Sequence, residues 1–256
     1  MCQLLAMNCN VPTDICFSFT GFQARGGATD VHRDGWGIAF FEGRGVRLFL
    51  DPQPSCESQV AELVRHYPIH SLNVIAHIRK ATQGRVALQN THPFQRELWG
   101  RYWAFAHNGD LKNHAPRLHG AFHPVGNTDS ELAFCWLMQE LAKAHAGLPS
   151  IAELTATLAE LVPRVAAHGT FNFMLSNGQA LWAHCSTNLH YLVRQHPFQA
   201  AHLQDDDMSV DFARVTTPAD RVAVVVTEPL TADEAWVAFK PGELKVFVDG
   251  QPVGAS

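Results

Sequence analysis

The sequence is poor in charged residues and has no excess of basic ones. Charged residues make up 17% of its 256 positions, and the formal net charge is −5. Without a basic face to follow a phosphate backbone, nucleic acid is not an expected partner. No apolar run approaches the length of a membrane-spanning helix, since the longest, residues 222–226, suits a buried strand. The first residues lack a basic segment before an apolar one, so we expect no signal peptide, no membrane contact and a cytoplasmic protein.

Patterns for metal and phosphate binding are missing as well. None of the six cysteines forms Cys-x-x-Cys, so reduced thiols are expected. The fifteen histidines include neither His-x-His nor His-Glu-x-x-His, so we expect no metal and no cofactor. Gly26-Gly27 is not followed by the Lys-Ser/Thr of a phosphate-binding loop. We interpret the acidic run 205–207 as a solvated loop rather than a cation site.

What the chain does have is a series of short strand patterns. Asn177-Gly178 is the dipeptide most typical of a tight hairpin, and residues 42–45 supply a second hairpin turn. With the other apolar segments of strand length, these turns predict strands over residues 35–41, 46–50, 73–79, 101–106, 170–176, 179–185, 189–195, 221–227 and 244–248.

Three segments carry helix signals. Positions 60, 63, 64 and 67 are apolar at helical spacing. Thr128 with Glu131, and Ser150 with Glu153, form capping boxes before two further helices, and we expect Pro163 to kink or break the second. The helices are segregated from the strands, and no repeat or long linker divides the chain. These patterns predict one α+β layered domain over residues 1–256.

Cys2 is the first candidate for catalysis. Removal of Met1 would make it the N-terminal residue, which then carries both a thiol nucleophile and a free α-amine. The amine has an unperturbed pKa of about 8, so part of it is unprotonated at neutral pH and can act as the base. If Met1 stays attached, this nitrogen belongs to a peptide bond and Cys2 is not competent. A Met-Cys start alone occurs by chance in many chains.

Four other residues offer what hydrolysis of a side-chain amide needs besides a nucleophile. We expect Asn108-Gly109 to open a turn after a strand, where both can donate to an oxyanion; such a donor lowers a barrier by roughly 3–4 kcal/mol. Arg79 offers a planar fork for a carboxylate, and Asp129 can pair with an ammonium. Taken singly, these residues are also explained by a turn, a surface ion pair and an acid at a helix N-terminus.

With Asp34-Gly35-Trp36-Gly37 and Arg79-Lys80-Ala81-Thr82, these motifs give the chain a clear resemblance. It is similar over most of its length to the class II glutamine amidotransferases, the N-terminal-cysteine branch of the Ntn hydrolases. It most resembles their stand-alone YafJ-type members. The resemblance implies a four-layer αββα sandwich of two antiparallel sheets flanked by helices.

The resemblance also implies a role for each site residue. Cys2 would be nucleophile and base, and the region of Gly84 and His92 would form a loop over the substrate. The other implied roles are an oxyanion hole from Asn108 and Gly109, an α-carboxylate site from Arg79 and Thr82, and an α-amine site from Asp129.

The implied reaction is hydrolysis of the γ-amide of glutamine or a γ-glutamyl compound through a thioester on Cys2, which releases ammonia or an amine. Lys80 and Gln83 depart from the Arg-Trp-Ala-Thr-His-Gly that larger amidotransferases often carry, which can change the γ-glutamyl compound that fits. No synthetase domain follows in this sequence, so we expect either a separate partner that accepts the ammonia or a role in which the hydrolysed amide is itself the product of interest. Two alternatives stay open: a catalytically silent regulatory subunit that binds a γ-glutamyl ligand, and an acylase of the same fold.

Overall fold

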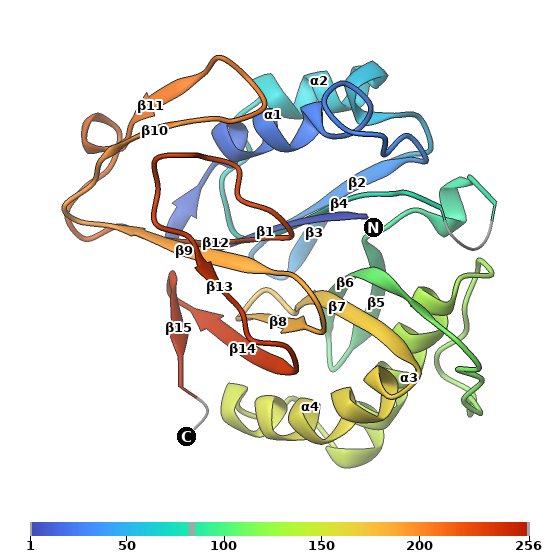
Figure 1. Cartoon of the computed structure of the whole chain (residues 1–256). Coiled ribbons are helices and arrows are strands. Elements are labelled where there is room, and N and C mark those ends of the chain that lie inside the picture. The colour runs from blue at the N-terminus through green and yellow to red at the C-terminus, as the bar shows by residue number, and fades with distance from the viewer. Residues whose placement is uncertain (1, 82–84, 255–256) are drawn as a thin grey trace.

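Two antiparallel sheets packed face to face form the centre of the molecule (Figure 1). The structure is a computed structural model that describes residues 2–81 and 85–254. The larger sheet has seven strands, in the order β13 (Val237–Ala238), β9 (His190–Gln195), β12 (Arg221–Val226), β1 (Gln3–Thr13), β4 (Ser71–Ile78), β2 (Trp36–Glu42) and β3 (Gly45–Asp51). The smaller sheet has six, in the order β15 (Gln251–Val253), β14 (Glu243–Val248), β8 (Leu181–Cys185), β7 (Gly169–Ser176), β6 (Arg101–Leu111) and β5 (Phe94–Leu98).

Helices cover the outer face of each sheet. On the larger sheet lie α1 (Cys16–Ala24) and α2 (Gln59–His66), and on the smaller sheet α3 (Asp129–Ala144) and α4 (Ile151–Ala166). Two short strands, β10 (Ala200–His202) and β11 (Ser209–Asp211), pair beside the larger sheet. Single helical turns are η1 (Ser55–Glu57), η2 (Leu88–Asn90) and η3 (Phe212–Arg214). The layers confirm the expected α+β, αββα fold.

Alanines line part of the layer between the sheets. The larger sheet contributes Leu4, Ala6 and Ala39, and the smaller sheet contributes Ala104 and Ala106, all fully buried. Because alanine projects only one carbon from the backbone, the two sheets approach closely here. Most aromatic residues fill the spaces between each sheet and its helices, where Trp36 packs on Phe19 at 5.6 Å between ring centroids, but Phe41, Phe239 and Phe247 lie between the sheets.

The three predicted helices are confirmed, with two exceptions in detail. Ser150 and Glu153 form a complete capping box, and the Thr128 hydroxyl accepts from the Glu131 N–H at 3.2 Å. The expected capping box at Thr128 is only half formed, because the Glu131 carboxylate accepts from the Val125 and Gly126 N–H groups instead. α4 nevertheless continues through Pro163 without a break. Pro163 lies in the last turn, and the helix ends three residues later at Ala166. The expectation of a break was therefore wrong.

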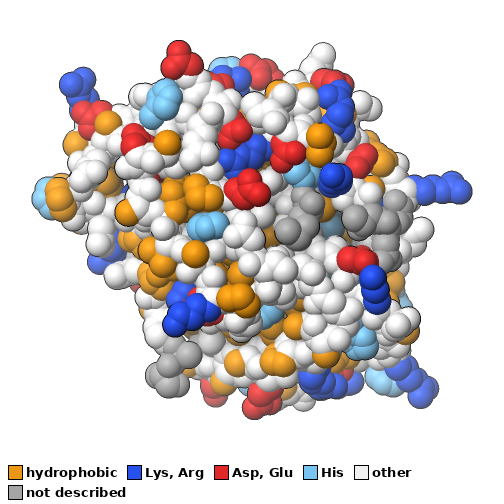
Figure 2. Space-filling view, viewed as in Figure 1, with side chains coloured by type: hydrophobic (Ala, Val, Ile, Leu, Met, Phe, Trp, Pro, Cys, Tyr) orange, Lys and Arg blue, Asp and Glu red, His pale blue; other side chains and the backbone are white. Residues whose placement is uncertain are grey.

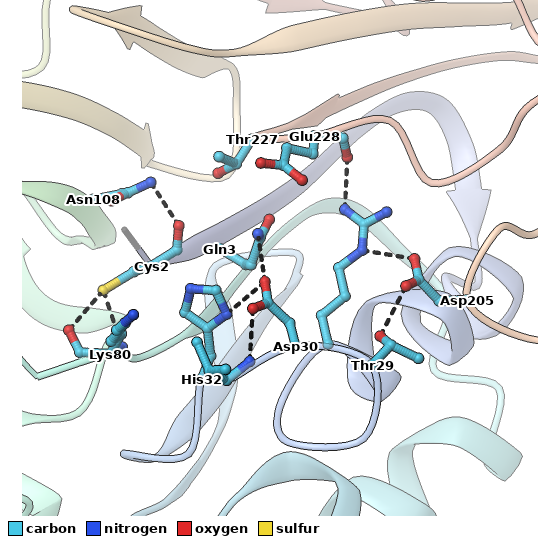
Figure 3. Close-up of polar contacts among 12 residues, drawn as sticks. Cys2, Gln3, Thr29, Asp30, His32, Lys80, Asn108, Asp205, Thr227 and Glu228 are labelled. Carbon is cyan, nitrogen blue, oxygen red and sulfur yellow. Dashed lines mark hydrogen bonds and ion pairs between the residues drawn. The ribbon is translucent and has the colours of Figure 1, made fainter.

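The acidic run 205–207 is also not simply a solvated loop. Asp205 forms an ion pair with Nε of buried Arg25 at 2.7 Å and accepts from the Thr29 hydroxyl at 2.8 Å (Figure 3). Arg25 donates further to the carbonyl oxygens of Glu228 and Pro229. This ion pair ties the loop after α1 to the loop between β10 and β11.

Surface charges of both signs are interspersed over the described part of the face in Figure 2. None of the helices among residues 2–81 and 85–254 is long and apolar enough to cross a membrane.

Candidate active site

Cys2 lies just before β1, the central strand of the larger sheet, beside the end of β4 (Figure 3). Its Sγ lies 3.3 Å from the carbonyl oxygen of Lys80 and accepts from the Lys80 N–H at 3.2 Å. Burial raises the pKa of the thiol above its ordinary value, although the Lys80 N–H and the charge of Arg79 act in the opposite direction. The thiol is therefore neutral near pH 7, and a nucleophilic role requires a base.

The Asp34-Gly35-Trp36-Gly37 motif holds the backbone next to this thiol. The Asp34 carboxylate accepts from the Ala81 N–H at 2.7 Å, and the Asp34 N–H donates to the Arg79 carbonyl oxygen at 3.1 Å. Gly35 has a φ of +105°, a conformation that favours glycine. At Gly37, an added Cβ would lie 2.4 Å from the His92 carbonyl oxygen, so only glycine allows this approach of the two backbones.

Asn108 and Gly109 come from the other sheet. The Asn108 Nδ2 donates to the carbonyl oxygen of Cys2 at 2.6 Å (Figure 3). The expected turn at these residues was wrong, because β6 continues to Leu111 and pairs Asn108 with Asn172 and Gly109 with Phe171 of β7. A Cβ at Gly109 would lie 1.8 Å from the Thr170 carbonyl oxygen, so the glycine is required by the neighbouring strand rather than by a turn.

Arg79 and Asp129 lie at the ends of two different elements, and the charge of Asp129 acts on Arg79. Arg79 follows β4, is 3% exposed and donates from Nη1 to the Arg85 carbonyl oxygen at 3.0 Å. Burial lowers the pKa of its guanidinium, while the charges of Cys2, Asp34 and Asp129 raise it. Asp129 begins α3, is half-buried and accepts from the Leu111 N–H through Oδ2 at 2.8 Å. Arg79 is thus a buried cation within electrostatic range of both the Cys2 thiol and the half-buried Asp129 carboxylate.

The family follows from a comparison with known proteins. A model of the family described as glutamine amidotransferases class-II matches residues 1–256. The chain belongs to this family. As a class II glutamine amidotransferase, the protein is an enzyme that acts on the amide of glutamine.

Full-length relatives agree with this assignment. The amidotransferase is 52% identical to YafJ of Escherichia coli (strain K12), itself provisionally assigned as a glutamine amidotransferase, over 99% of this chain and 100% of YafJ. A crystal structure of a provisionally assigned glutamine amidotransferase from Pseudomonas aeruginosa PA01 has a TM-score of 0.80 and 45% identity over 98% of this chain and 99% of its own. The glutamine phosphoribosylpyrophosphate amidotransferase of B. subtilis has a TM-score of 0.60 and 15% identity over 99% of this chain and 49% of its own, which shows a shared fold alone.

His92, expected in the loop over the substrate, has a buried side chain in the amidotransferase. Its side chain is 4% exposed, and its ring lies 4.2 Å from His77 and 4.4 Å from Phe94 between centroids. Burial lowers the pKa of His92 well below its ordinary value, so the ring is neutral. Thr82, expected beside Arg79, and Gly84, expected in the loop over the substrate, lie outside the described residues.

His107 is a further part of the site to which the sequence assigned no role. Its Nε2 lies 3.0 Å from the Thr170 carbonyl oxygen, which can only accept, so Nε2 carries the proton. Burial lowers the pKa of His107, and the neutral ring then accepts from the Ser130 hydroxyl through Nδ1 at 2.8 Å. His107 therefore joins β6, which carries Asn108, to α3, which carries Asp129. The sequence signal that could have pointed to His107 was its position directly before Asn108-Gly109.

No group of three or more His, Cys, Asp or Glu side chains suited to a metal ion occurs in the part of the chain that the structure describes.

Proposed function

We propose that this amidotransferase hydrolyses the γ-amide of glutamine or of a γ-glutamyl compound through a thioester on Cys2, once Met1 has been removed. The observation that carries the proposal is the 2.6 Å hydrogen bond from the Asn108 amide to the Cys2 carbonyl oxygen. This contact brings a strong donor from the second sheet to the residue that bears the nucleophile.

In the first half of the reaction, the free α-amine of Cys2 takes the proton of the thiol. The raised pKa of this thiol is why a base is needed. The thiolate then attacks the γ-carbonyl carbon, and the Asn108 amide and the Gly109 N–H stabilise the oxyanion that forms. The α-ammonium returns its proton to the leaving nitrogen, the C–N bond breaks, and ammonia or an amine leaves.

In the second half, the α-amine removes a proton from water, which attacks the thioester carbon. Collapse of the second tetrahedral intermediate breaks the C–S bond, and the thiolate regains the proton held by the amine. Glutamate is released, and Cys2 returns to its starting state. We propose a separate synthetase or other acceptor enzyme as the consumer of the ammonia.

Recognition of the substrate is assigned to the charges of Arg79 and Asp129. Arg79 would bind the α-carboxylate through its planar fork, and Asp129 would bind the α-amine. Thr82 and His92 remain proposals as further substrate contacts. A pair of opposite charges fits an amino-acid end better than the apolar chain that an acylase would bind.

The test is the intact mass of the purified protein before and after incubation with 6-diazo-5-oxo-norleucine, a reactive glutamine analogue. Loss of Met1 and one adduct on Cys2 are expected. Cys2→Ala should take no adduct, whereas the control Cys56→Ala, at a thiol of similar partial exposure, should react like the wild type. A processed chain that takes no adduct would refute glutamine recognition and favour an acylase or a silent binding protein. A purified chain that retains Met1 would refute the N-terminal base.

A further inference from the structure

Asn90 is a buried side chain that bonds to two loops at once. It is 2% exposed and ends η2. Its Nδ2 donates to the Arg85 carbonyl oxygen at 3.0 Å and to the Asn127 Oδ1 at 2.9 Å, while its Oδ1 accepts from the Asn127 N–H at 3.0 Å. A side-chain amide has two N–H donors and one oxygen, so both kinds of group are engaged. We refer to Arg85, Asn90 and Asn127 as the Asn90 clasp.

One end of the clasp reaches Arg79. The Arg85 carbonyl oxygen that binds Asn90 also accepts from the Arg79 Nη1 at 3.0 Å. A carbonyl oxygen has two lone pairs and can accept both bonds. Since Arg79 is itself buried, a movement of Arg85 would displace the guanidinium.

The other end of the clasp reaches the helix that carries Asp129. Asn127 lies two residues before it, and Glu131 in the first turn of α3 accepts from the Gly126 N–H at 2.7 Å. This bond couples the segment to the helix. A Cβ on Gly126 would lie 2.1 Å from the Asn90 Oδ1, so glycine is required for the close approach to Asn90.

The α-carboxylate and the α-amine of an amino acid are attached to one carbon, so the groups that bind them must keep a fixed separation. Arg79 follows β4 of the larger sheet, whereas Asp129 belongs to α3 above the smaller sheet. We propose that Asn90 is a positioning residue that sets this separation, and with it the preference for substrates that carry both groups. The inference rests on the proposed function, in which Arg79 and Asp129 bind the amino-acid end.

The test compares two substrates in the wild type and in Asn90→Ala. Glutamine presents both groups, and glutaramate, which is glutamine without its α-amine, presents only the carboxylate. For glutamine we expect Asn90→Ala to lower kcat/KM at least about tenfold through KM, toward the hundredfold that a displacement of about 1 Å can cost. For glutaramate we expect a much smaller decrease in kcat/KM, because this substrate uses Arg79 but has no α-amine for Asp129 to bind. Alkylation of Cys2 by iodoacetamide should keep its wild-type rate.

The matched control is Asn73→Ala. Asn73 is equally buried and donates to the Gly178 carbonyl oxygen, but its hydrogen bonds lie away from Arg79 and Asp129. It should lower thermal stability without changing the ratio of the two kcat/KM values. If Asn90→Ala does not fold, the same comparison of glutamine with glutaramate is made with Asn127→Ala, because Asn127 is exposed and bonds to Asn90.

Equal losses for the two substrates, or no loss for either, would overturn the positioning role while the proposed function stood. A wild-type protein that does not hydrolyse glutamine would instead overturn the proposed function, and the clasp with it.

Discussion

Replacement of Asn108 by alanine tests whether its amide acts on the reaction or only on the fold. The variant removes the donor that lies 2.6 Å from the Cys2 carbonyl oxygen. It leaves the β6–β7 pairing intact, because the backbone of Asn108 still faces Asn172. The perturbation is therefore confined to one side chain beside Cys2.

Two magnitudes can be worked out for this variant. Loss of an oxyanion donor costs about 2.7–4 kcal/mol of activation free energy, which is roughly a 10²–10³-fold decrease in kcat. The loss of one hydrogen bond costs about 1 kcal/mol of folding stability. This cost is offset in part because the Asn108 Oδ1 is buried without a hydrogen-bond partner among the described residues, and the variant removes that atom too.

The assay is steady-state release of ammonia from glutamine, with thermal melting measured on the same samples. We expect kcat to fall at least about a hundredfold, KM to stay close to the wild-type value and the melting temperature to change little. Asn73→Ala is again the control, because it removes a buried asparagine without touching the oxyanion donors. A decrease in kcat of less than about tenfold would refute the role of Asn108 in stabilising the oxyanion.

Three further predictions follow from the same site. Asp129→Asn should raise the KM for glutamine sharply in initial-rate assays, whereas an unchanged KM would argue against an ammonium contact. Activity should fall as the pH drops below about 8, because the α-amine of Cys2 becomes protonated, and a flat profile from about pH 5 to 9 would require another base. Burial lowers the pKa of His77 from its ordinary value of 6.5 to about 3 in the folded protein. Below about pH 6.5 the unfolded chain therefore takes up a proton that the folded protein does not, and the free energy of unfolding decreases. Between pH 7 and 5, the free energy of unfolding of His77→Phe, measured in urea, should therefore decrease by about 2 kcal/mol less than that of the wild type. An equal decrease in both proteins would contradict a buried neutral ring.

Local signals explain why much of the fold could be predicted. The Asn177-Gly178 hairpin and the caps at Thr128 and Ser150 depend on residues close in sequence, and the structure confirms all three. β1 and α1 were missed because polar residues interrupt their apolar patterns: Asn8 and Asn10 lie within β1, and Ser18 and Thr20 lie within α1.

The errors at the site have a different cause. Asn108-Gly109 is a turn signal that β7 overrides by pairing with β6, a contact with residues more than sixty positions away. The pairing of Arg25 with Asp205 spans 180 positions, and no pattern in the sequence marks it. Cys2, Arg79 and Asp129 could be singled out because their chemistry is distinctive, whereas Asn90 and His107 act through partners that only the tertiary structure brings together.

Because alanines lie between the two sheets, the rate of the reaction should depend on the distance between the sheets. Cys2 lies just before the start of the central strand of one sheet and the Asn108 amide on the other, so the distance between them is set by side chains such as Ala6, Ala104 and Ala106. A larger side chain at one of these positions would push the two sheets apart. We therefore expect substitutions far from Cys2, such as Ala104→Val, to reduce turnover before they unfold the protein, since a shift of a few tenths of an ångström weakens catalysis sooner than it breaks a β-sheet.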